Sequence, residues 1–194
     1  MNEKALEALV GEILRSLGQT IEDLKSCLFS GNKRQMNEAK KTFASSLRSS
    51  LPLFEEAMRR KDKSPLDSKL MTLLPSLQRL GLAVEDVIAG VQAAVETGVC
   101  LTDRALGEIS EIMALLADLA RDTNDVLATK NVRFRAYAVS SALRIRERSV
   151  ESTLEHEKRL ISGTCSPRAS FVYLHVMDAL KRVAQELGSL CEQA

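Results

Sequence analysis

The two histidines are the first residues to consider for chemistry, because histidine serves both as a general base and as a metal ligand. His156 stands between two glutamates, and His175 follows Tyr173 and Leu174. A zinc-protease motif of the HExxH type needs a second histidine four residues after the first, and neither histidine has one. No serine or cysteine pattern of a nucleophilic enzyme accompanies them. We interpret both as ordinary helix residues, and we expect a protein that is not an enzyme and uses no cofactor.

The cysteines and the apolar segments of the chain indicate the cellular compartment of the protein. No two cysteines form a CxxC pair, and their spacing fits neither a disulfide framework nor a zinc site. They are Cys27, Cys100, Cys165 and Cys191. The first residues carry charges where a signal peptide is apolar, and no stretch approaches the ~18 apolar residues of a membrane span. We expect free thiols in a cytoplasmic protein without a transmembrane segment.

Five arginines in the second half of the chain form a basic cluster that could face nucleic acid. They are Arg133, Arg135, Arg144, Arg146 and Arg148. The formal net charge is only +1, so the chain lacks the strong positive field of a typical nucleic-acid binder. Acidic side chains also precede and follow the cluster, at Glu108, Glu111, Asp118, Asp122, Asp125, Glu147 and Glu151. We interpret the cluster as interhelix ion pairs on a solvated face and expect no nucleic-acid partner.

Helical periodicity runs through nearly the whole chain. The 194 residues are 45% hydrophobic and 4% aromatic, which suits helices packed by aliphatic side chains. Six segments carry apolar residues at steps of three and four, and a stripe of this kind is the face that a helix buries. Helix ends are predicted at Gly31, Asn32, Ser64-Pro65, Thr102, Gly163 and Ser166-Pro167. Pro52 should bend or split the second helix, and Pro75 should kink the third.

Two of these stripes lie on the second and the fifth predicted helices. The stripe of the second helix runs through Met36, Ala39, Phe43, Leu47, Leu51, Phe54 and Met58. The stripe of the fifth helix runs through Val132, Ala136, Val139, Leu143, Val150, Leu154 and Ile161.

A short motif occurs once in each half of the chain. Leu77-Gln78-Arg79-Leu80-Gly81 and Leu180-Lys181-Arg182-Val183-Ala184 each follow a Ser-Pro pair by a similar distance. The repetition predicts a duplicated helical unit. We therefore expect an all-α fold of two pseudo-repeated antiparallel three-helix bundles, with residues 1–100 as the first repeat and 101–194 as the second.

Two three-helix units whose third helices carry an arginine-centred motif resemble the PhoU family. The segment around Leu14–Ile21 is similar to the opening helix of that family. The segment Cys165–Leu174 resembles the lead-in to the last helix of PhoU-like domains at the C-terminus of bacterial sodium/phosphate cotransporters. The resemblance covers essentially the whole chain. It implies a regulatory or adaptor role in phosphate transport or phosphate signalling, through contact with a phosphate transporter, its ATPase or a sensor kinase.

The chain departs from the family at the carboxylates that help to hold metal clusters in its members. The resemblance places those acids at Gln78, Leu82, Lys181 and Gln185, where this chain has none. Hard oxygen ligands are what such clusters need. Glu85 and Asp86 follow the first motif but point about 100° apart on a helix, so we do not expect them to replace the lost ligands, and we expect no metal site.

The matched arginines, Arg79 and Arg182, have two interpretations. Each forms a structural salt bridge between helices, which we favour, or each contacts a partner. The alternative to an adaptor is a metal- or ligand-binding helical-bundle protein. The sequence leaves open whether the chain is a standalone protein or the cytoplasmic domain of a cotransporter. It also leaves open peripheral membrane association and a homodimer.

Overall fold

A computed structural model describes residues 3–60 and 64–194, and these residues form six α-helices and no β-strand. The all-α prediction is therefore confirmed. The helices are α1 (Glu3–Ser30), α2 (Lys33–Arg59), α3 (Pro65–Thr97), α4 (Asp103–Thr129), α5 (Val132–Ile161) and α6 (Pro167–Gln193).

Local capping explains where these helices begin and end. Gly31 adopts the left-handed conformation (φ 65°) that ends α1, and the side chain of Asn32 accepts hydrogen bonds from two backbone N–H groups of α2. Ser64 and Asp67 form a reciprocal capping box at the start of α3. The predicted ends at these residues are confirmed. Pro52 lies inside a continuous α2, so it does not split the helix, and the predicted bend stays a prediction.

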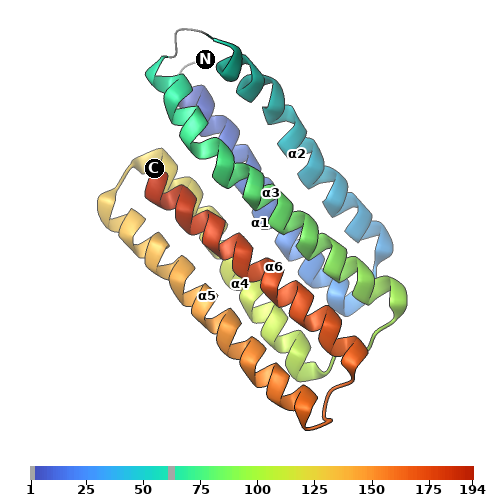
Figure 1. Cartoon of the computed structure of the whole chain (residues 1–194). Coiled ribbons are helices and arrows are strands. Elements are labelled where there is room, and N and C mark those ends of the chain that lie inside the picture. Colours follow the sequence, from blue (N-terminus) through green and yellow to red (C-terminus); the bar gives the residue numbers. More distant parts are fainter. Residues whose placement is uncertain (1–2, 61–63) are drawn as a thin grey trace.

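The helices pack into one bundle with four central and two outer members (Figure 1). In the centre α1 contacts α3 and α4, and α6 contacts α3 and α4. Outside this group α2 packs on α1 and α3, while α5 packs on α4 and α6. One continuous hydrophobic core includes residues of all six helices. The internal repeat and the division at residue 100 stay predictions.

Two glycines let α6 approach its neighbouring helices closely. A Cβ atom on Gly90 of α3 would lie 2.5 Å from Val176 Cγ2 of α6, so the absence of a side chain at this glycine permits close packing. A Cβ atom on Gly188 of α6 would lie 3.0 Å from the Cβ of Ala142 of α5. Because α5 and α6 come so close, the face of α5 at this contact has room only for small side chains.

The apolar stripe predicted for the fifth helix does not face the core. The buried residues of α5 are Ala138, Ala142, Ile145, Ser149, Ser152 and His156. Six residues of the predicted stripe are exposed instead, namely Val132, Ala136, Leu143, Val150, Leu154 and Ile161. We call these six residues the outer stripe of α5. The expectation that the stripe is the buried face is therefore wrong for this helix, because close approach to α6 selects small side chains.

Candidate partner-binding surface

The two motif arginines lie on α3 and α6. These two central helices belong to different halves of the chain and contact each other. Arg79 Nε donates to Glu186 Oε1 of α6 at 3.0 Å. Its NH2 group donates to Ser76 Oγ of its own helix at 3.2 Å. The Glu186 side chain is only 6% exposed, whereas that of Arg79 is 54% exposed. Arg79 therefore neutralises a buried carboxylate while much of its guanidinium still faces solvent.

Arg182 forms the reciprocal contact from α6 to α3. Its NH1 group donates to Asp86 Oδ2 at 2.8 Å, and its Nε donates to Asp178 Oδ2 at 3.2 Å. Both partners are partly exposed, so this bridge has more solvent around it than the Arg79–Glu186 bridge. The structure thus places the two arginines in salt bridges between α3 and α6. That either arginine contacts a partner stays a prediction.

An apolar groove between α2 and α3 contains the first pair of altered motif positions. Gln78 and Leu82 lie one turn apart on its wall, and both are exposed. The groove has a volume of about 390 Å³ and a floor that includes Leu47, Phe54 and Leu77. Leu82 is 61% exposed. The leucine at the lost carboxylate position is therefore a surface residue of a groove and not part of the core.

The second pair of altered positions has different surroundings. Gln185 lines a more polar hollow between α5 and α6, together with Leu143 and Arg146. Lys181 forms an ion pair with Asp178 at 2.7 Å, and this contact lowers the pKa of the Asp178 carboxyl below its usual value. Only the groove between α2 and α3 therefore combines the motif positions with an apolar floor.

The arginine cluster of α5 forms few of the interhelix ion pairs that we expected. Arg148 contacts Glu111 of α4 at 3.4 Å and Glu151 of its own helix at 2.8 Å. Arg144 instead donates to two serines of α5, and its guanidinium lies 5.9 Å from the centre of the Tyr137 ring. In the described part of the chain, Arg144 and Arg146 form no ion pair. The expectation of ion pairing holds for one arginine and fails for these two.

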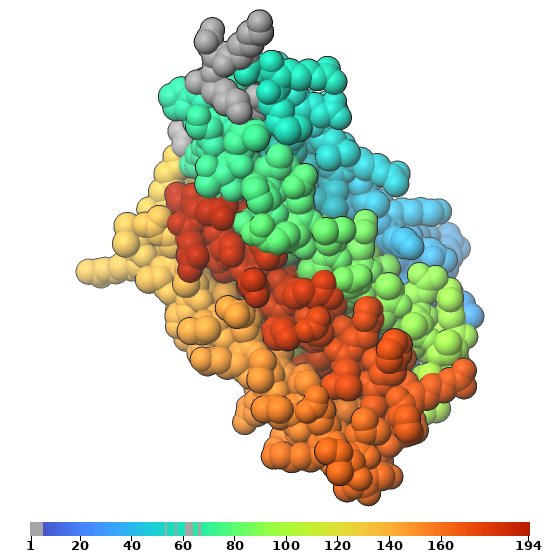
Figure 2. Space-filling model, viewed as in Figure 1, coloured from blue at the N-terminus to red at the C-terminus, as the bar shows by residue number. Residues whose placement is uncertain are grey.

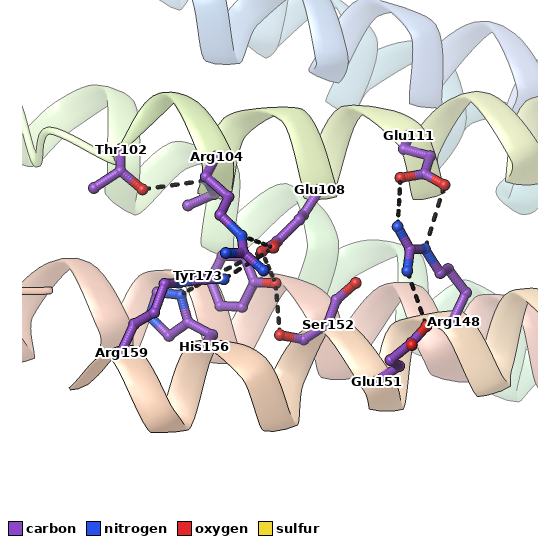
Figure 3. A network of polar contacts seen from close by, with 11 residues as sticks. Thr102, Arg104, Glu108, Glu111, Arg148, Glu151, Ser152, His156, Arg159 and Tyr173 are labelled. Atoms are coloured by element: carbon purple, nitrogen blue, oxygen red, sulfur yellow. Dashed lines mark hydrogen bonds and ion pairs between the residues drawn. The ribbon is translucent and has the colours of Figure 1, made fainter. Parts of the chain in front are cut away.

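A buried polar network joins α4, α5 and α6 (Figure 3). The carboxylate of Glu108 accepts two hydrogen bonds from Arg159, at 3.0 and 2.7 Å, and one from the Tyr173 hydroxyl at 2.6 Å. Arg104 adds a further bond to the same carboxylate at 3.0 Å. Burial alone would raise the pKa of Glu108, but these hydrogen bonds hold it below its usual value. Burial and the hydrogen bond to Glu108 raise the pKa of Tyr173.

His156 completes this network from α5. Its ring stacks on Tyr173 with 3.9 Å between the centroids. Arg159 NH2 lies 3.1 Å from Nδ1, and because a guanidinium can only donate, Nδ1 carries no proton. Nε2 then donates to Ser170 Oγ at 3.0 Å. Burial first, and the charge of Arg159 second, lower the pKa of His156, so the ring is neutral near pH 7.

This network holds three helices together through hydrogen bonds between their side chains. Its central members are buried or half-buried, and none of them lines the grooves described above. No three His, Cys, Asp or Glu side chains within residues 3–60 and 64–194 gather in a way that could hold a metal ion. All four cysteines carry free thiols. The exposed features that the described residues offer are therefore the two grooves and the salt bridges between α3 and α6.

The periodicity that predicted the helices left two features unnoticed. The Glu108 network depends on the alignment of three helices, so the sequence carries no local signal for it. The buried face of α5 does have a signal, because its residues, four of them alanine or serine, recur at steps of four and three from Ala138 to His156. None of the helices in the described ranges is long and apolar enough to cross a membrane. Comparison of the chain with protein-family models, with curated proteins and with solved structures finds no match.

Proposed function

We propose that this chain is a PhoU-like regulatory or adaptor protein of phosphate transport or phosphate signalling, which acts in the cytoplasm by contact with another protein. The observation that carries the proposal is the apolar groove between α2 and α3, with Leu51 and Leu82 exposed on it. Soluble proteins that expose apolar side chains around a hollow commonly use it to bind a partner.

The shape and the lining of this groove suit an amphipathic helix. Such a helix inserts apolar side chains three and four positions apart, as in other helix-in-groove complexes. The groove supplies apolar contacts from Leu47, Phe54 and Leu77, and Glu85 lies on its wall. A basic residue beside the apolar anchors of the partner would complement the Glu85 carboxylate. The resemblance to PhoU assigns such a helix to a phosphate transporter, its ATPase or a sensor kinase.

The same role fits a standalone protein and the cytoplasmic domain of a sodium/phosphate cotransporter. In the first case the partner is a separate chain, and in the second it is another part of the transporter. No observation favours the alternative of a metal- or ligand-binding bundle over an adaptor.

Replacing Leu82 with aspartate tests the proposal. Because this side chain is 61% exposed, the substitution should leave the free energy of unfolding within about 1 kcal/mol of the wild type. A charged group in an apolar contact should nevertheless abolish partner binding. The expected result is that cells with Leu82→Asp show the phosphate uptake and the phosphate-starvation response of a strain that lacks the gene.

Phe29→Asp provides the matched control. Phe29 is also 61% exposed, but it lies on α1 and is not among the residues that line this groove. This variant should behave like the wild type in both assays. If Leu82→Asp also keeps normal uptake and a normal starvation response, the groove is not the working surface. If deletion of the gene changes neither, the assignment to phosphate transport is wrong.

A further inference from the structure

The outer stripe of α5 is an apolar helix face that no other described element covers. Its six residues are exposed, and Ile161 reaches 87% exposure. At 100° per residue they fall within an arc of about 40°, so they form one narrow line along the helix. Figures 1 and 2 show α5 along one long edge of the molecule, with α2 along the opposite edge.

The spacing of this stripe is that of a helix that pairs with another helix. Leu143, Val150, Leu154 and Ile161 follow one another at steps of seven, four and seven. Two helices that cross at a small angle bury side chains spaced in this way against each other. The stripe is not a by-product of core packing, because the core contact of α5 is made by the buried residues on its other side, from Ala138 to His156.

The charges of α5 indicate which helix fits this face. The N-terminal half of the helix carries the basic residues Arg133, Arg135, Arg144 and Arg146 and no acidic residue. The C-terminal half carries the acidic residues Glu147, Glu151, Glu155 and Glu157, with Arg148 among them and Lys158 and Arg159 at its end. A second α5 lying antiparallel would therefore set basic residues beside acidic ones, whereas a parallel copy would set like charges side by side.

We propose that two copies of this chain associate through the outer stripe of α5, with the two helices antiparallel. In the register that we infer, Leu143 lies beside Leu154 of the second copy. The same register brings Arg144 near Glu151 of the second copy, and the two-fold axis makes each of these contacts twice. Among the described residues Arg144 forms no ion pair, only hydrogen bonds to two serines of α5 and a contact with the Tyr137 ring, so its charge is left for this pair.

A second copy fits better than a lipid surface. Glu147 and Glu157 lie at the edges of the stripe and are exposed, so an anionic membrane would meet carboxylates along the same line. A contact limited to one helix pair buries a small interface, under about 1,200 Å², and the dimer should therefore dissociate in the micromolar range. The groove between α2 and α3 stays open in such a dimer, so this inference does not depend on the proposed function.

Sedimentation velocity of the full chain, from about 1 to about 200 µM, tests the inference. The wild type should change from monomer to dimer over this range, and Leu154→Glu should raise the dissociation constant at least tenfold. Phe29→Glu, on the exposed side of α1, is the matched control and should leave it unchanged. Circular dichroism should show the same helix content in all three proteins, because Leu154 and Phe29 are both exposed. A wild type that stays monomeric, or a dimer that Leu154→Glu does not weaken, overturns the proposal.

A charge exchange tests the register. Arg144→Glu and Glu151→Arg should each weaken the dimer, because each places like charges together at both contacts. The double variant should restore the wild-type dissociation constant to within about threefold, since it re-forms the ion pairs with their charges reversed. A double variant that dimerises no better than the single variants overturns the antiparallel register. Flotation of the wild-type protein with phosphatidylglycerol vesicles, lost in Leu154→Glu, would show that lipid and not a second copy covers the stripe.

Discussion

The outer helices α2 and α5 have comparable places in the bundle, yet they bury opposite kinds of side chain. Each packs on the first and the third helix of its half of the chain. In α2 most of the apolar stripe faces inward, with Met36, Phe43 and Phe54 almost fully buried, although Leu51 is exposed. In α5 the inward face carries two alanines, two serines, Ile145 and His156, and six of the seven residues of the apolar stripe face outward. An apolar stripe of the same periodicity therefore packs into the core in α2. In α5 it stays exposed, on the face that we propose binds a second copy of the chain.

The largest expected effect comes from truncating matched members of the two stripes. Phe43→Ala should lower the free energy of unfolding by about 3–5 kcal/mol, because it leaves a cavity beneath α2. Leu154→Ala in α5 should change it by no more than about 0.5 kcal/mol, since this side chain is already in solvent. Urea denaturation, at a protein concentration where the chain is monomeric, measures the unfolding free energy of both variants. Equal losses in the two variants would mean that α5 packs through its outer stripe.

The helix ends and the fold class could be predicted from sequence because they depend on neighbouring residues. Ser64 and Asp67 cap α3 with groups three positions apart, and Gly31 ends α1 by its own backbone conformation. The orientation of α5 could not be predicted in this way. Periodicity identifies the most apolar face of a helix, but Gly188 on α6 decides which face has room to be buried.

The candidate site likewise has a part that the sequence predicted and a part that it could not predict. The motif predicted that Arg79 and Arg182 correspond, but it could not predict what they contact. Their acidic partners, Glu186 and Asp86, lie on the opposite helix about a hundred positions away in the chain, and only the antiparallel alignment of α3 and α6 brings them together. The groove that contains Gln78 and Leu82 likewise needs α2 as its second wall.

An intermediate effect is expected from enlarging the small buried face of α5. Ala142→Leu forces a larger side chain against Gly188, where α5 and α6 are closest, and should cost about 1–3 kcal/mol of unfolding free energy. Ala136→Leu places the same change on the exposed side of the same helix and should be neutral within about 0.5 kcal/mol. Thermal denaturation of the two variants compares these losses of stability. A neutral Ala142→Leu would show that the contact between α5 and α6 can widen, so that close packing does not explain the inverted face.

The smallest expected effect is a histidine-linked pH dependence, which α5 carries at His156 and which α2, having no histidine, lacks. The groups that act on His156 are Arg159, Glu108, Glu157, Tyr173 and Ser170. Burial disfavours the charged ring, and protonation of Nδ1 would also break the hydrogen bond from Arg159 and bring two positive charges together. These two causes lower the pKa of His156 below its ordinary 6.5 in the folded state, so the unfolded chain binds more protons in the window below that pH. The contribution of His156 to stability is complete above about pH 6.5 and is lost as the pH falls through the lowered pKa.

Urea denaturation at about pH 7 and about pH 5.5 measures this contribution. The wild type should lose more unfolding free energy between these two values than His156→Gln, which has no titrating group at this position. His175→Gln, which changes the half-buried histidine of α6, should keep the wild-type difference. Comparing the variants cancels the change in unfolding free energy that all other titratable groups contribute at acidic pH. If His156→Gln shows the full wild-type difference, the pH dependence has another origin, and the buried polar face of α5 is as insensitive to acid as the apolar face of α2.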